Sequence, residues 1–310
     1  MANQSETFAP RGIWPVLYAY FDADNRLDLR AIHAQIDHTI SAGAGGIVIL
    51  GLATEVNRLS LEEKQRFIAC TGEHVAQRVP FAVTVSGDSV DTQLALADYA
   101  VDHGASSLIL QPPSSRDQPE SFYFDFFSEV MQRVRVPVGI QNAPEYLGVG
   151  LSVESLAVLA ARCAQFQWLK GEGPATVIQS TIERLREQRS ALPVFNGRGG
   201  QELVDNLRAG CAGLIVAPDS FDWQAAIYGA FVEGDQQKAQ TLYERILPSI
   251  VFVMQSLDAL TCYGKRIAAW RMGFDVEHDR GMQPTAFGLA CARRHASALG
   301  LFADQRGSCN

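Results

Sequence analysis

The sequence has few of the features that mark secreted or membrane proteins. Its six cysteines stand singly, with no CxxC pair and no clustering, so a disulfide framework is not indicated and reduced intracellular thiols are expected. The amino terminus, MANQSETFAP, lacks the basic and apolar regions of a signal peptide. The longest apolar stretch, residues 246–260, is interrupted by Pro248, Gln255 and Asp258, so no membrane span is predicted. We therefore expect a cytoplasmic protein.

Motifs for several chemistries are also missing. The net charge of −8 comes from charges scattered along the chain, which provides no phosphate-tracking surface and argues against nucleic acid as a partner. No GxxxxGK[ST], and no GxGxxG after a strand, indicates a nucleotide site, and no GxSxG indicates a serine hydrolase. The six histidines form no HxH or HExxH and none ends a predicted strand, so no metal site is expected. No cofactor is called for.

Short apolar segments rich in strand-forming residues recur through the first 217 residues, and segments of helical period lie between them. The predicted strands are 12–20, 45–51, 81–87, 106–112, 136–142, 166–170, 193–196 and 213–218. Near-continuous apolar strands that alternate with amphipathic helices are typical of a parallel sheet covered by helices. Eight such units match a (β/α)8 TIM barrel better than an open sheet, and its active site is expected in the loops that follow the strands.

Helix boundaries support this reading. Ser60 and Glu63 form a capping box, and Gly43, Gly104 and Gly210 stand where helices should end. After about residue 222 the strand signal disappears and only helical patterns remain. We therefore expect residues 1–230 to form the barrel that carries the active site, and residues 231–310 to form a C-terminal helical region.

The segment WLKGEG ends the sixth predicted strand with a lysine, followed two positions later by a glutamate. Side chains two apart on an extended segment point the same way, so Trp168, Lys170 and Glu172 can all face the barrel axis. A desolvated lysine can attack a ketone to form a Schiff base, and a nearby carboxylate can carry protons. The alternative is that Lys170 begins a solvated loop and Glu172 is a strand-end carboxylate paired with a basic residue.

Five motifs, in order, resemble the dihydrodipicolinate synthase/N-acetylneuraminate lyase family of class I aldolases and dehydratases, over nearly the whole chain. They are GGIVILGLATEVNRLSLEEK (45–64), VPVGIQNAP (136–144), WLKGE (168–172), NGRGG with AGCAGLIVAP (196–218), and GDQQKAQTLYERILP with YGKRIAAWRMG (234–273). The resemblance implies a TIM barrel, a Schiff-base role for Lys170, a 2-oxo acid substrate and a homotetramer built from dimers. Glu55 stands where a family glutamate is usual, and we expect it to have a structural role.

Departures from the family pattern narrow the expected reaction. The paired threonines and glycine of the family loop are replaced by Leu52, Ala53 and Thr54. Gln141 replaces the tyrosine of strand 5, and an amide can hydrogen-bond but cannot relay a proton at neutral pH. The aromatic pair after strand 4 is replaced by Pro113 and Ser114, which puts the family's inter-subunit tyrosine relay and the usual dimer contact in doubt.

A further departure is Tyr146, which replaces the arginine that binds the second substrate's carboxylate in the synthases. Synthesis of dihydrodipicolinate is therefore in doubt. The combination IQNAP, LKGE and GRGG is more similar to the 2-keto-3-deoxy-L-arabonate dehydratase-like branch of the family.

This branch implies dehydration of a 2-keto-3-deoxy sugar acid. Lys170 and Glu172 are the expected catalytic residues, because dehydration needs a proton taken from C3 and one given to the departing C4 hydroxyl. The expected substrate-binding residues are Ala53, Thr54, Gln141, Gly197, Arg198 and Ile215. For the NGRGG loop, contact of Arg198 with the distal hydroxyls and a purely conformational role remain alternatives. Two other functions stay open: a pyruvate-dependent aldolase or synthase-like enzyme, and a non-catalytic barrel that binds a keto acid.

Overall fold

A computed structural model describes residues 8–302 of the chain, and eight parallel strands alternate with helices along it. The strands are β1 (Gly12–Pro15), β2 (Ile47–Ile49), β3 (Phe81–Val85), β4 (Ser107–Leu110), β5 (Val138–Asn142), β6 (Phe166–Gly171), β7 (Val194–Asn196) and β8 (Gly213–Val216). Each lies within one of the eight predicted segments, apart from a one-residue extension of β6. The strands are shorter than predicted because several apolar segments continue into buried loops.

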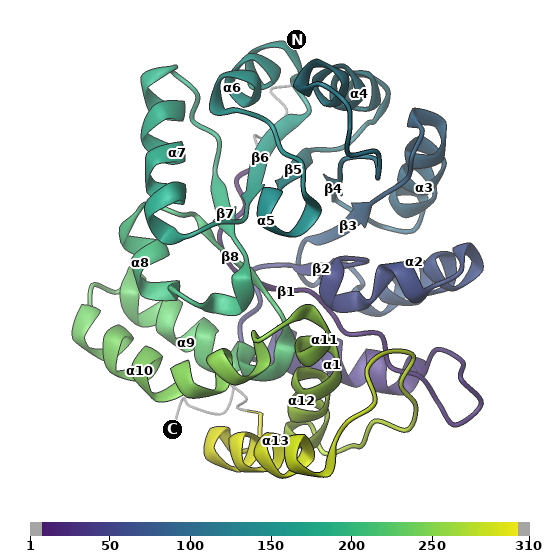
Figure 1. Ribbon diagram of the computed structural model, residues 1–310, viewed down its shortest axis with the longest axis vertical. Helices are drawn as coiled ribbons and strands as arrows, with labels where there is room; N and C mark the ends of the chain where they lie inside the picture. The colour runs from purple at the N-terminus through teal and green to yellow at the C-terminus, as the bar shows by residue number, and fades with distance from the viewer. Residues whose placement is uncertain (1–7, 303–310) are drawn as a thin grey trace.

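The sheet closes into a barrel. The strands are hydrogen-bonded in the order β1-β8-β7-β6-β5-β4-β3-β2. A parallel bridge between Val16 and Val48, with the Leu17 N–H donating to the Val48 carbonyl at 2.9 Å, joins the first strand to the second. The expected TIM barrel is confirmed, and Figure 1 shows its strands inside a ring of helices.

Most helices of the ring follow a strand. The helices up to α9 are α1 (Leu29–Ser41), α2 (Leu61–Val75), α3 (Val90–Asp102), α4 (Glu120–Arg133), α5 (Pro144–Leu147), α6 (Val153–Arg162), α7 (Ala175–Glu187), α8 (Leu203–Arg208) and α9 (Phe221–Val232). Four 3-10 turns lie in the loops: η1 (Leu52–Thr54), η2 (Val56–Arg58), η3 (Arg198–Gly200) and η4 (Pro218–Ser220). The capping box of Ser60 and Glu63 begins α2 as predicted.

Three aromatic side chains fill the barrel interior beneath the carboxyl ends of the strands. Trp14, Trp168 and Phe195 are almost completely buried, and their ring centroids lie 5.7–6.2 Å apart. The Trp168 indole N–H donates to Ser107 Oγ at 3.0 Å. A Cβ atom at Gly139 would collide with the Trp168 ring, so glycine is required there. The packed floor leaves Lys170, two residues after Trp168, at the carboxyl end of the barrel.

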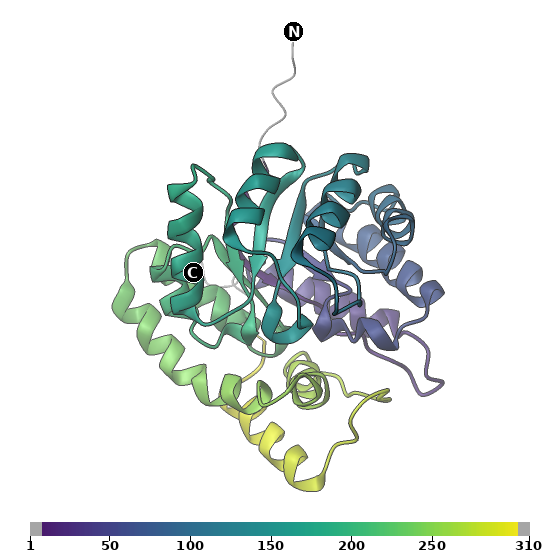
Figure 2. The same ribbon diagram turned by 45° about the horizontal axis from the view of Figure 1, so that its top comes forward.

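The C-terminal helices form a layer against this barrel. They are α10 (Gln236–Val253), α11 (Leu257–Ala259), the π-helical turn η5 (Leu260–Gly264), α12 (Lys265–Arg271) and α13 (Ala286–Leu299). Helix α10 packs along α9, and α12 packs against η4 and α13. Arg271 of α12 makes two hydrogen bonds of 2.7 and 2.8 Å to Asp222 of α9. Figure 2 shows this region, green to yellow, gathered at one side of the barrel.

Among residues 8–302, no single helix is long and apolar enough to span a membrane. Helix α10 and the segment Leu257–Arg271 together have the required length and composition, but they meet at a bend of 106°.

Candidate active site

Strand β6 places a lysine and a carboxylate side by side. Lys170 pairs in register with Gln141 of β5 and with Phe195 of β7. The Glu172 N–H donates to the Asn142 carbonyl at 3.0 Å, which extends the β5–β6 pairing by one residue. Alternate residues of an extended chain share a face, and Lys170 Nζ lies 3.6 Å from Glu172 Oε1. Only 3% of Lys170 and 8% of Glu172 is exposed, so Lys170 does not begin a solvated loop.

A chain of two glutamine side chains supports Glu172: Gln141 contacts Glu172, and Gln111 contacts Gln141. Gln141 Nε2 donates to Glu172 Oε2 at 2.6 Å, and Gln141 Oε1 accepts from Gln111 Nε2 at 2.8 Å. Both ends of the Gln141 amide are therefore occupied. Because Nε2 is the donor, the amide supports a carboxylate that still has Oε1 free to face Lys170. A hydrogen bond of this kind restricts the carboxylate side chain to one rotamer.

The two groups open into a cavity at the carboxyl end of the barrel. It holds about 440 Å³ of empty space, part of which opens to solvent. Its lining residues are Val16, Leu52, Ala53, Tyr146, Lys170, Glu172, Arg198, Gly199, Ile215, Val216, Ala217, Met254, Leu257 and Leu260. Two of them, Tyr146 and Arg198, add a hydroxyl and a guanidinium to the lysine and the carboxylate, and most of the others are apolar.

Of the predicted site residues, five line this cavity: Ala53, Lys170, Glu172, Arg198 and Ile215. Three others lie beside it, and their side chains or backbone meet protein groups. Gln141 holds Glu172. The Thr54 hydroxyl donates to the Leu17 carbonyl at 2.7 Å and the residue is completely buried. In the loop after β2, Leu52 and Ala53 therefore line the cavity, while the Thr54 hydroxyl is directed into the barrel wall.

Gly197 makes room for the carboxylate of Glu172. A Cβ atom at this position would collide with Glu172 Oε1. The backbone of Gly197 thus lies against Glu172, and it is Gly199 that lines the cavity. Between them Arg198 has a left-handed φ of 54°, a conformation that costs free energy in a residue with a side chain. The Arg198 guanidinium lies 3.1 Å from Glu202 and 3.8 Å from Glu145, which fixes its place at the cavity rim.

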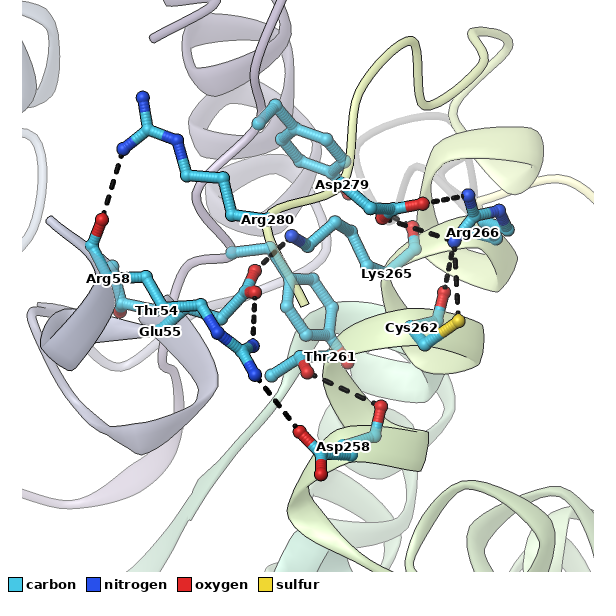
Figure 3. Close-up of polar contacts among 12 residues, drawn as sticks. Thr54, Glu55, Arg58, Asp258, Thr261, Cys262, Lys265, Arg266, Asp279 and Arg280 are labelled. Atoms are coloured by element: carbon cyan, nitrogen blue, oxygen red, sulfur yellow. Dashed lines mark hydrogen bonds and ion pairs between the residues drawn. The ribbon is translucent and has the colours of Figure 1, made fainter. Parts of the chain in front are cut away.

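The loop after β2 is fastened to the C-terminal helices by ion pairs, drawn in Figure 3. Glu55, which has a left-handed φ of 57°, separates η1 from η2. One of its carboxylate oxygens accepts from Arg58 at 2.8 Å and the other is paired with Lys265 of α12. Arg58 also pairs with Asp258 of α11 at 3.2 Å. These contacts support the structural role expected for Glu55, because its carboxylate faces cations and not the cavity.

Burial raises the pKa of the Tyr146 hydroxyl, the Arg198 guanidinium opposes the rise, and the negative charge of Glu172 adds to it. Because the net shift of this pKa is upward, the Tyr146 hydroxyl stays protonated at neutral pH. Tyr146 is carried by the single-turn helix α5, whose end is marked by Gly148 in the left-handed region. It is a cavity residue that the sequence marked only as a departure from the family pattern.

Other cavity residues had no signal in the sequence at all. Met254, Leu257 and Leu260 come from the C-terminal region, more than 80 residues after Lys170 in the chain. Their apolar side chains match those of any packed helix, so only the tertiary structure assigns them to the site. Gln111 was likewise unremarkable in sequence, since its role depends on pairing with Gln141 of the next strand.

The chain matches the family model described as the dihydrodipicolinate synthetase family over residues 9–279. An L-2-keto-3-deoxyarabonate dehydratase of Azospirillum brasilense is 30% identical over 252 residues, which cover 80% of this chain and 81% of that protein. A protein of Escherichia coli K12 named a probable 2-dehydro-3-deoxy-D-pentonate aldolase is 26% identical over 239 residues, 76% of this chain and 79% of its own. The structure of YagE from E. coli K12, solved with pyruvate, has a TM-score of 0.86 and 22% identity, and covers 93% of this chain and 98% of YagE. This last similarity shows a shared fold.

Proposed function

Because the chain belongs to the dihydrodipicolinate synthetase family, we propose that it is a Schiff-base-forming lyase that dehydrates a 2-keto-3-deoxy sugar acid through an imine on Lys170. Named relatives include a dehydratase and an aldolase, so the chain is a carbon–oxygen or carbon–carbon lyase. The observation that carries the finer proposal is the buried pair of Lys170 and Glu172, 3.6 Å apart at the cavity, with Gln141 in place of a strand-5 tyrosine.

Imine formation needs an uncharged amine, and Glu172 is close enough to accept the ammonium proton of Lys170. The amine then attacks the C2 ketone of the substrate, and Glu172 returns the proton to the carbinolamine hydroxyl, which leaves as water and gives the iminium. The resulting iminium withdraws electrons from the C2–C3 bond and makes the C3 proton acidic. Most of the residues that line the cavity are apolar, which limits the water that would otherwise hydrolyse the imine before reaction.

Elimination follows from the enamine. Glu172 accepts the C3 proton, and the electron pair of that C–H bond forms the enamine. The enamine then expels the C4 hydroxyl, which leaves as water once it is protonated. Hydrolysis of the conjugated imine frees Lys170 and releases the unsaturated 2-oxo acid. No group outside the protein is needed for these steps.

The amide at position 141 favours dehydration over cleavage of a C–C bond. Retro-aldol cleavage must remove a proton from the C4 hydroxyl, the task that the family tyrosine usually performs. Gln141 has both ends of its amide engaged and does not reach the cavity lining, so it cannot take that proton. An aldolase that uses pyruvate and an aldehyde remains the second candidate, and the 26% identical E. coli protein named as an aldolase favours it.

The test begins with trapping of the imine. The protein is incubated with pyruvate or a 2-keto-3-deoxy acid, reduced with borohydride and analysed by mass spectrometry after digestion. The adduct is expected on Lys170 and absent from Lys170→Ala. Lys265→Met is the matched control, because Lys265 is also buried but pairs with Glu55 outside the cavity. An unmodified Lys170 would reject both enzyme proposals and leave the binding-only barrel.

A product assay separates the two enzymes. Conversion of 2-keto-3-deoxy-L-arabonate or related acids to an unsaturated or dioxo acid supports dehydration, while release of free pyruvate would overturn it in favour of the aldolase. Glu172→Gln should still form the reduced adduct, but turnover should fall by about 10²-fold or more.

We also expect a cytoplasmic homo-oligomer, a dimer or tetramer. The five described cysteines, Cys70, Cys163, Cys211, Cys262 and Cys291, are buried and unbridged, as reduced thiols would be, and Cys309 lies outside the described residues. Light scattering after size-exclusion chromatography measures the assembly.

A further inference from the structure

The dehydration proposed above needs an acid for the departing hydroxyl, and Gln141 cannot supply it. A single carboxylate could serve both proton transfers only if Glu172 reached both C3 and the C4 oxygen. Its movement is restricted, however, because Gln141 Nε2 holds Oε2 at 2.6 Å while Oε1 lies 3.6 Å from Lys170 Nζ. A second proton donor elsewhere in the cavity would remove this conflict.

We propose that Tyr146 is this donor: it lines the cavity with Lys170, Glu172 and Arg198, and its hydroxyl protonates the C4 hydroxyl as that group leaves. The inference rests on the proposed dehydration and adds a catalytic residue to it. Tyr146 stands five positions after the tyrosine that the family carries on strand 5 and that this chain lacks. This chain therefore carries a tyrosine in the loop after β5, where the family carries one on strand 5 itself.

The loop that carries Tyr146 is anchored at both ends, as a catalytic residue requires. Asn142, the last residue of β5, accepts from the Leu151 N–H at 2.7 Å and donates to the Leu151 carbonyl at 3.0 Å. Within the loop, the Tyr146 N–H donates to the Ala143 carbonyl at 3.0 Å. The segment between residues 142 and 151 is thus a closed loop whose single helical turn holds Tyr146 over the end of the barrel. Figure 1 shows α5 beside the ends of β5 and β6.

Arg198 provides the charge that a phenol needs when it gives up its proton. Its guanidinium contributes to the electrostatics of the Tyr146 hydroxyl and opposes the effect of burial. Arg198 lies on η3, in the loop after β7, whereas Tyr146 lies in the loop after β5. The Arg198 guanidinium pairs with Glu145, the neighbour of Tyr146, at 3.8 Å. Arg198 Nε, the atom that faces Glu145, is buried and makes no hydrogen bond among the described residues. The strained φ of Arg198 is consistent with a residue held in place for such a function.

The proton balance closes without an external reagent. Glu172 takes the proton from C3 and the C–H electrons form the enamine. The C4–O bond breaks with its electrons on oxygen, which accepts the Tyr146 proton and departs as water. The phenolate that remains is balanced by the charge of Arg198 and regains a proton from Glu172, which lines the same cavity. One water is lost and both residues return to their starting states.

Partial reactions distinguish this role from a structural one. Pyruvate has no hydroxyl to expel, so exchange of its methyl protons with D₂O requires Lys170 and Glu172 but not a leaving-group acid. In Tyr146→Phe we expect unchanged borohydride adduct, unchanged exchange by NMR, and a kcat for dehydration reduced by about 10²-fold. Glu172→Gln should instead lose exchange as well as dehydration. Tyr228→Phe is the matched control, because Tyr228 lies on α9 near Gly12, at the other end of the barrel.

A leaving group that needs no proton provides the decisive comparison. With 4-fluoro-2-oxobutanoate, Tyr146→Phe should release fluoride at a rate close to that of the unaltered protein, although dehydration is slow. Equal losses for both substrates would reveal a structural role and overturn the inference, and so would full dehydration activity in Tyr146→Phe. If the unaltered protein forms no adduct or releases pyruvate, the proposed dehydration fails instead, and the inference fails with it.

Discussion

Glu55 and Lys265 form a buried ion pair. Replacing Glu55 should lower the free energy of unfolding more than replacing Lys265. Lys265 is 1% exposed, and among residues 8–302 the partners found for its ammonium are Glu55 and the ring of Phe21, whose centroid is 5.5 Å away. Glu55, by contrast, has a second cation in Arg58 at 2.8 Å. Glu55→Gln therefore leaves a buried ammonium without a counter-charge, while Lys265→Met leaves a carboxylate that is still paired.

The expected magnitudes follow from this asymmetry. A buried charge stripped of its partner typically destabilises a protein by about 3–5 kcal/mol, and we expect Glu55→Gln to lie in that range. Loss of one charged hydrogen bond with the other retained costs about 1–3 kcal/mol, which we expect for Lys265→Met. The double variant should be less destabilised than the sum of the two by about 0.5–3 kcal/mol, because the residues are in direct contact.

Urea denaturation monitored by circular dichroism measures these free energies, at one fixed protein concentration because an oligomer is stabilised by mass action. The borohydride adduct at Lys170, trapped well below the unfolding transition, is the accompanying control and should form in all three variants. A Glu55→Gln variant that costs less than Lys265→Met would refute the reasoning. Loss of the adduct in a folded Glu55→Gln protein would show that Glu55 acts in the chemistry and not only in the architecture.

Three further changes test the site and its surroundings. Gly197→Ala places a Cβ against Glu172 Oε1, so turnover should fall by about 10-fold or more, while the imine can still be trapped with borohydride. The matched control is Gly229→Ala, which should leave turnover unchanged because a Cβ there meets nothing within 4 Å. Gln141→Leu removes the donor to Glu172 and leaves the Gln111 amide unpaired, so we expect a loss of about 1–3 kcal/mol in urea denaturation and lower kcat with normal adduct formation. Burial raises the pKa of Asp219 to about 6 from 3.8, against hydrogen bonds from Tyr18 and Ser220. A raised carboxyl pKa means that the folded state binds the proton more tightly than the unfolded state. The free energy of unfolding therefore falls by roughly 3 kcal/mol as the pH rises from about 4 to about 6. Denaturation midpoints across this range should fall for the unaltered protein relative to Asp219→Asn, and parallel pH profiles of the two proteins would contradict this prediction.

The parts of the site that the sequence predicted are those fixed by local periodicity. Lys170 and Glu172 share a face because side chains of a strand alternate, and β6 continues its pairing through the Glu172 N–H. The eight strands could be predicted for the same reason, since each is a short apolar segment followed by helical pattern. Strand ends were less predictable: the segment 12–20 yields only Gly12–Pro15 as a strand, and its buried remainder is held by loop contacts.

The parts that could not be predicted depend on contacts between distant segments. The direction of the Thr54 hydroxyl is set by a 3-10 turn that brings it to Leu17, and nothing in the letters LATE indicates that geometry. Lys265 is one of only two lysines buried below 9% exposure among the described residues, yet its sequence context, YGKRIAAW, gives no reason to pair it with Glu55. Long-range electrostatic partners are chosen by packing, which local patterns do not encode.

The distribution of polar groups in the cavity restricts how a substrate can lie. The polar groups that line it, Lys170, Glu172, Tyr146 and Arg198, come from the end of β6 and from the loops after β5 and β7. The other lining residues are glycine or apolar. They include Ile215 and Val216 of β8 and, from the C-terminal region, Leu257 and Leu260, which flank the Asp258 that pairs with Arg58. Under the proposed function, a sugar-derived acid bound as an imine to Lys170 is expected to turn its hydroxyls toward Tyr146 and Arg198, because burying a hydroxyl against apolar residues without a partner costs free energy. Under the same proposal, the C-terminal helices help to orient the substrate, although they contribute no reacting group.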